Sequence, residues 1–205
     1  FIHRQLPDQE IYFVSNQSDQ PQDLKPLFRV TGMKAQIWNP VTAERMNIAL
    51  QDNGQTSTAD LHLEANESAF IVFSNEQETG LTDYSPTERE TLLTIDTPWK
   101  VDFQKGMRGP DETYVMTELQ TWDKNEDERI RYFSGTATYT NTFKLKKQPD
   151  QPVWIDLGRV MVMARVYVNN QYAGGVWTSP YRLNIQHLLH KGTNTLRVEV
   201  VNNWQ

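Results

Sequence analysis

Residues 166–185 read VYVNNQYAGGVWTSPYRLNI, and this stretch decides the fold class. Over residues 166–169 apolar and polar side chains alternate, which is the period of a strand with one buried face. Asn169 and Asn170 tolerate the positive φ of a tight hairpin turn, and Gly174 and Gly175 allow a bulge or a close backbone approach. The stretch therefore indicates antiparallel β-structure followed by an aromatic-rich loop.

Short runs of this kind recur along the chain and are bounded by turn residues. In the first half they cover residues 10–14, 27–30, 35–38, 47–50, 60–63 and 69–73. In the second half they cover residues 99–103, 137–145, 153–157, 164–169, 181–185 and 195–201. The helical candidates are a short helix at 86–91 and one turn near 185–189, too little for the crossovers of a parallel sheet.

The sequence thus predicts an all-β chain of two antiparallel β-sandwiches, because strand runs of this number suit two units of about 100 residues. We expect a first sandwich at 1–80, a polar connector at 81–98 and a jelly-roll sandwich at 99–205. Residues 107–116 and the charged run 123–129 are predicted to be loops.

Composition excludes several classes of function. The net charge is −6 with scattered Lys and Arg, which argues against nucleic acid as a partner. No apolar run approaches the roughly 18 residues of a membrane span, so we expect no membrane insertion. The chain has no cysteine, hence no disulfide and no thiolate zinc site. No signal peptide opens it, and both ends resemble cut sites, so we expect either a piece of a longer protein or a mature or trimmed product.

The second half carries an ordered set of motifs that resembles the galactose-binding-like, sugar-binding sandwich of family 2 and related glycoside hydrolases. The motifs are YFSGTATY at 132–139, IDLG at 155–158, ARVYVNN at 164–170, YRLNI at 181–185 and KGTNTL at 191–196. The usual Asn-Gly turn of that family is Asn169 and Asn170 here.

The first half resembles the region that follows the catalytic barrel in α-L-rhamnosidase-like enzymes of glycoside hydrolase family 106. Its motifs are IHR at 2–4, IYFVSN at 11–16, FRVTG at 28–32, WNPVT at 38–42 and SAFIVF at 68–73. The resemblance implies a non-catalytic accessory part of a glycoside hydrolase that acts on polysaccharides. It also implies a catalytic barrel of the same parent chain as a partner, and a periplasmic or secreted location.

Trp177, Tyr181 and Arg182, with Tyr172 beside them, are the candidate sugar-binding residues. Aromatic rings stack on the C–H faces of sugars, and a guanidinium is a planar donor for hydroxyl groups. The alternative is structural: Trp177 plugs the end of the sandwich, and Tyr181 anchors a corner through its hydroxyl.

His3 and Arg4 are candidate contacts at the rim of a preceding barrel, the alternative being a frayed terminus. His187 and His190 are three residues apart, but no third ligand is evident, so we expect no metal site there. A structural calcium ion is implied only by the resemblance, with Asp102, Asp111 and Glu112 as oxygen donors.

Hydrolysis of a glycosidic bond needs two opposed carboxyl groups, one of them protonated. The acidic clusters, Glu88 with Glu90 and residues 126–128, are expected in exposed segments, so we predict no catalytic residues in this chain. Two rival readings stay open: a stand-alone carbohydrate-binding module, and a structural interaction module without a ligand. The latter predicts a large exposed apolar patch.

Overall fold

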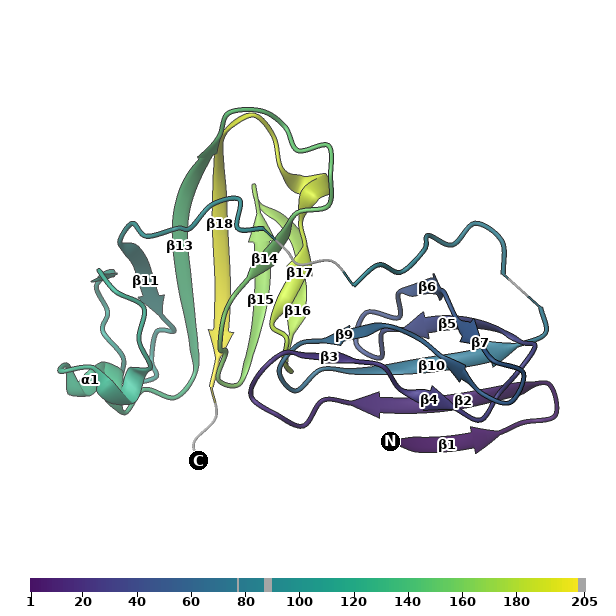
Figure 1. Ribbon diagram of the computed structural model, residues 1–205. Helices are drawn as coiled ribbons and strands as arrows, with labels where there is room; N and C mark the ends of the chain where they lie inside the picture. Colours follow the sequence, from purple (N-terminus) through teal and green to yellow (C-terminus); the bar gives the residue numbers. More distant parts are fainter. Residues whose placement is uncertain (77, 87–89, 203–205) are drawn as a thin grey trace. The chain divides into compact units, whose positions relative to one another are not determined.

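The computed structural model describes residues 1–76, 78–86 and 90–202, and the chain divides into two compact units, Phe1–Glu90 and Thr91–Gln205. Each unit is built from antiparallel strands (Figure 1). The prediction of an all-β chain of sandwiches is therefore confirmed. Within the described residues no helix is long and apolar enough to cross a membrane.

The first unit has a five-stranded sheet with the strand order β1-β2-β10-β5-β6. These strands are β1 (Ile2–Gln5), β2 (Gln9–Ser15), β10 (Ser68–Ser74), β5 (Lys34–Trp38) and β6 (Arg45–Ile48). A second layer is made of two smaller ladders, β3-β9 and β4-β8-β7. Its strands are β3 (Gln22–Leu24), β9 (Leu61–Leu63), β4 (Leu27–Phe28), β8 (Ser57–Thr58) and β7 (Gln51–Asp52).

The core of the first unit lies between these layers and is aromatic at its centre. Tyr12 and Phe73 of the five-stranded sheet meet Phe28 of the other layer, with ring centroids 4.9–5.8 Å apart in edge-to-face geometry. Ile71 and Leu61 fill the space beside them and are at most 1% exposed. Burial of these side chains is the main favourable term for this unit.

The second unit has a six-stranded sheet with the order β12-β11-β13-β18-β15-β16, and a two-stranded pair, β14-β17. The sheet comprises β12 (Tyr114–Met116), β11 (Trp99–Phe103), β13 (Thr136–Leu145), β18 (Gly192–Val201), β15 (Met163–Val168) and β16 (Gln171–Val176). The pair comprises β14 (Trp154–Asp156) and β17 (Arg182–Asn184). Strands β13 and β18 pair over ten positions and form the spine of the sheet.

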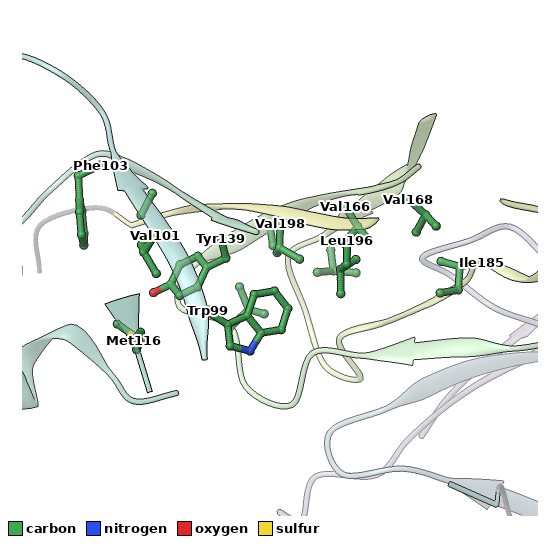
Figure 2. Close-up of a cluster of buried hydrophobic side chains, with 14 of the residues drawn as sticks. Trp99, Val101, Phe103, Met116, Tyr139, Val166, Val168, Ile185, Leu196 and Val198 are labelled. Carbon is green, nitrogen blue, oxygen red and sulfur yellow. The ribbon is translucent and has the colours of Figure 1, made fainter. Parts of the chain in front are cut away.

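Alternation along these strands builds the second core. Val101, Val166 and Val168 are fully buried on one face of the sheet, and their neighbours in sequence face away from it. Figure 2 shows these side chains gathered on that face with Tyr139, Leu196 and Val198. Ile155 and Leu183 of the β14-β17 pair pack against the same cluster, so the unit is a closed sandwich.

The turn between β15 and β16 is held by a buried amide network. Asn169 and Asn170 have φ values of 51° and 65°, as the sequence predicted for a tight turn. The side chain of Asn194, fully buried, accepts from the Asn169 amide group at 2.8 Å and donates to the His190 carbonyl at 2.8 Å. The network fixes the turn from which β16 begins.

Several local predictions need correction. The charged run 123–129 is not a loop throughout, because a 3₁₀ turn η1 (Trp122–Lys124) and a helix α1 (Glu128–Arg131) occupy part of it. The Asp127 carboxylate accepts the Arg129 amide at 2.9 Å and so caps α1. Strand β12 lies inside the expected loop 107–116, and β16 was missed. The turn near 185–189 is confirmed as η2 (Gln186–Leu188). The expected helix at 86–91 falls largely on residues 87–89, outside the described residues.

The segment predicted as a connector is attached at both ends. Tyr84 packs against the first core, and its hydroxyl accepts from the His62 amide at 2.9 Å. Ile95 packs against the second core, and Asn141 donates from Nδ2 to the Thr97 carbonyl at 3.0 Å. The division between the units falls between these attachments, at Glu90 and Thr91.

Candidate functional site

The loop 177–181 joins β16 to β17 and carries the first candidate for sugar binding. Trp177 follows the last residue of β16 and is 58% exposed, so its indole is not a buried plug. At the far end of the loop, the Tyr181 carbonyl accepts from the Leu157 amide at 3.0 Å. The loop therefore presents an open aromatic ring from an anchored backbone, as binding loops on rigid sheets do.

Tyr181 immediately precedes β17, and the Arg182 amide donates to the Pro180 carbonyl at 2.9 Å, which makes a tight turn about Tyr181. Tyr181 packs against the core of the second unit, and the anchor through its hydroxyl stays a prediction. Arg182 lies on the outer side and donates from Nε to Asp156 Oδ2 at 2.7 Å. Arg182 and Asp156 are register partners across β14 and β17, which fixes the guanidinium group on that surface.

Tyr172 lies on the side of the six-stranded sheet that is turned away from the core, and it is 58% exposed. Its ring lies 5.4 Å from that of Tyr167 on the neighbouring strand. The Arg197 guanidinium covers Tyr167 at 3.7 Å and pairs with Glu199. The Tyr172 hydroxyl lies close to Gly175, 3.4 Å from the position that a Cβ would take there.

Sequence reasoning missed Tyr167 and Arg197 as neighbours of Tyr172. The sequence alternation predicts that Arg165, Tyr167 and Asn169 face outward. It does not predict that β15 pairs with both β16 and β18. The signal that makes the cluster is strand register, which a single sequence does not encode locally.

The structure does not gather the four predicted sugar-binding residues into one pocket. Tyr172 lies on the side of the large sheet that is turned away from the core, and Trp177 lies in the loop. Arg182 lies on the outer side of the β14-β17 pair, whereas Tyr181 contributes to the core. Trp177 and Tyr172 keep open ring surface for a sugar C–H face. Their role in binding stays a prediction.

His3 and Arg4 lie in β1, the edge strand of the five-stranded sheet, and not in a frayed end. The His3 ring stacks on Tyr12 at 4.1 Å and its Nε2 lies 2.6 Å from Glu10 Oε2. Arg4 is the next residue and therefore points to the opposite side, where it lines a groove. The two residues do not form one contact site.

The groove has a volume of about 490 Å³ and an apolar lining. It is lined by Ile2, Arg4, Ile11, Phe13 and Phe70. No lining residue belongs to the core of the first unit, so the groove lies on the face of the five-stranded sheet that is turned away from that core.

The carboxyl groups with displaced pKa values do not suit a general acid. Backbone hydrogen bonds from Gly32 and Gly54 lower the pKa of Asp52, and hydrogen bonds from Arg129 lower those of Glu112 and Asp127. A glycosidase acid needs its pKa raised by burial. Glu88 lies outside the described residues. Among the described residues, each carboxyl group with a displaced pKa is therefore favoured in its ionised form.

Metal binding has little support in the described ranges. No group of three or more His, Asp or Glu side chains there is arranged to hold an ion. Two of the oxygen donors considered for calcium are engaged otherwise: Asp102 accepts from Thr113 at 2.6 Å, and Glu112 pairs with Arg129 at 2.9 Å. The structural calcium ion stays a prediction.

Comparison with known families confirms the resemblance seen in the sequence. Residues 1–52 match the family model of glycoside hydrolase family 106, described as α-L-rhamnosidase. Residues 114–205 match the glycosyl hydrolase 2 galactose-binding domain-like family. The second unit is thus a glycoside-hydrolase-related, galactose-binding-like domain.

Two individual proteins extend this finding. The rhamnosidase structure from Novosphingobium sp. PP1Y is 34% identical, with a TM-score of 0.84 over 98% of this chain and 19% of its own. A protein from Formosa agariphila, named as a candidate β-glucuronidase, is 40% identical over 90 residues, which is 42% of this chain and 8% of its own length. The chain therefore spans about a fifth or less of the relatives it matches.

Proposed function

We propose that this chain is a non-catalytic accessory part of an α-L-rhamnosidase-like glycoside hydrolase that cleaves O-glycosidic bonds in polysaccharides. The observation that carries the proposal is the match to one rhamnosidase over 98% of this chain but only 19% of the relative. Both units are thus similar to part of one much longer enzyme.

The chemistry of the carboxyl groups also supports a non-catalytic role for this chain. Asp52, Glu112 and Asp127 are held as carboxylates by hydrogen-bond donors, and a retaining or inverting mechanism needs one protonated acid facing a second carboxylate. In this proposal the two acids lie in the catalytic barrel of the parent chain, which is the principal partner of this region.

Contact with carbohydrate is the second element of the proposal. Trp177 and Tyr172 offer open rings, and the Arg182 and Asp156 pair offers polar groups on a separate surface. Open aromatic rings on a sandwich are chemically suited to sugar faces. These exposed rings also favour the second candidate, a carbohydrate-binding module that works without the enzyme. Polysaccharide substrates place either form in the periplasm or outside the cell.

The test is made in the full parent protein with a chromogenic aryl α-L-rhamnoside and a rhamnose-containing polysaccharide. We expect Glu112→Gln and Asp127→Asn to leave kcat unchanged, and replacement of paired acids outside this chain to abolish it. A parent without any such acids contradicts the enzyme proposal. Glycan binding by this chain alone then supports the independent module.

A further inference from the structure

The central strand of the first unit is apolar on both of its faces. In β10 the run Ala69-Phe70-Ile71-Val72-Phe73 has no polar residue, a pattern typical of strands covered from both sides. Ala69, Ile71 and Phe73 belong to the core cluster, whereas Phe70 and Val72 lie on the opposite face, where Phe70 is half-buried and Val72 is only 4% exposed. One face of the sheet is thus covered by the second layer, and the other is apolar without such a cover within the described residues.

Strand register turns this pattern into a continuous surface, which we call the outer face. Across four strands, Ile2, Phe13, Phe70 and Trp38 are consecutive register partners. Phe13 and Phe70 contact each other with ring centroids 5.1 Å apart. The groove of about 490 Å³ runs between β1, β2 and β10 on this face. Ile2 at its edge is 63% exposed.

Two guanidinium groups border the outer face. Arg4 lines the groove, and no carboxylate among the described residues forms a salt bridge with it. On the opposite side Arg45 lies over Trp38 at 4.8 Å and pairs with Glu78 at 3.0 Å. An apolar centre with guanidinium groups at its border matches the anatomy of a protein interface.

We propose that the outer face is the surface on which the catalytic domain of the parent glycoside hydrolase docks, an inference that rests on the proposed function. The rhamnosidase relative contains about five times as much chain as this one matches, which supplies a covering partner in the same polypeptide. Arg4 in the groove calls for an acidic group on that partner.

Two other occupants fit the face less well. A sugar needs several polar partners for its hydroxyl groups, and the groove offers one guanidinium among four apolar side chains. A symmetric dimer would bring this patch against itself, and the groove lining supplies no carboxylate to meet Arg4.

Photo-crosslinking in the full parent protein tests this surface. A benzophenone amino acid replaces Phe13 in one variant and Leu27 in a matched control; Leu27 lies in the same unit, in the opposite layer, and is 64% exposed. We expect crosslinks from position 13 to peptides of the catalytic domain, and none to that domain from position 27. Crosslinks confined to residues 1–205, crosslinks to a second copy, or no crosslink from position 13 would overturn the inference.

A second measurement uses the charge-introducing variant Phe70→Asp, with Leu27→Asp as control. We expect Phe70→Asp to lower the unfolding temperature of the catalytic domain in the parent, and Leu27→Asp to leave it unchanged. Equal behaviour of the two variants also contradicts the inference, although the proposed function survives. A parent protein that contains no catalytic domain would contradict the proposed function itself. Failure of the docking inference can therefore be distinguished from failure of the proposed function.

Discussion

Phe13 and Phe70, register partners on β2 and β10, pack ring against ring at 5.1 Å on the side of the sheet that faces away from the core. Phe73, three residues further along β10, points into the core and is fully buried. Two phenylalanines of one strand therefore have different physical roles, and substitution separates them.

Phe73→Ala is expected to destabilise the first unit by about 3–5 kcal/mol, because it opens a cavity beside Tyr12 and Phe28. Phe70→Ala should cost only about 1 kcal/mol, mainly the loss of its contact with Phe13. Urea unfolding of the two variants gives the comparison. Equal losses of stability would mean that the outer face is packed as tightly as the core.

Asn194→Ala is expected to destabilise the second unit by roughly 1–3 kcal/mol for each buried backbone group that it leaves without a partner. The Asn194 side chain bonds the amide and the carbonyl of His190 as well as the side chain of Asn169. Thr193→Ala, at the exposed neighbouring position, is the control and should change little. A cost for Asn194→Ala no larger than that of the control would contradict the role of this network.

Trp177→Ala and Tyr172→Ala are expected to leave the unfolding midpoint almost unchanged, since both rings are largely exposed. If they bind sugar, each should weaken glycan affinity by about fivefold or more, measured by calorimetry with the best ligand from a glycan array.

Tyr181→Ala is predicted to act in the opposite way. It should lower stability by roughly 1–2 kcal/mol because its ring packs against the core. Loss of glycan affinity in Tyr181→Ala at unchanged stability would place this residue in a binding site instead.

The hydrogen bonds to the Asp52 carboxylate are expected to stabilise the first unit at neutral pH and to lose this effect in acid. Its carboxylate accepts the Gly32 amide at 2.8 Å and the Gly54 amide at 2.7 Å, and these bonds lower its pKa below the ordinary value of 3.8. The stabilisation is therefore complete above that ordinary value and is lost as the pH falls through the lower, folded-state pKa. The difference in urea midpoint between the wild type and Asp52→Ala should shrink from pH 6 to pH 3. A difference that does not change with pH would contradict this assignment.

Strand alternation made most of the fold predictable. The run at 99–103 alternates strictly, and the structure places a strand at Trp99–Phe103 with every second residue buried. The elements that were missed are short or lack apolar alternation, such as β8 (Ser57–Thr58) and β16 with its two glycines. Tertiary pairing, and not local propensity, makes these segments strands.

The candidate site was predictable by residue type but not by arrangement. Trp177 and Tyr172 were identified from their place near glycines and a turn, and both are exposed. Tyr181 and Arg182 were grouped with them by proximity in sequence, yet Tyr181 packs against the core whereas Arg182 begins β17 and pairs with Asp156. The apolar outer face was visible in the run at 69–73 only once the sheet order showed which face lacks a second layer.

The most direct test of the central claim is the release of nitrophenol from 4-nitrophenyl α-L-rhamnopyranoside by the purified 205-residue chain. The account predicts a rate equal to that of buffer for this chain, and turnover by the longer parent protein under the same conditions. Hydrolysis by the chain alone that is abolished by a single substitution of one of its own carboxylates would contradict it.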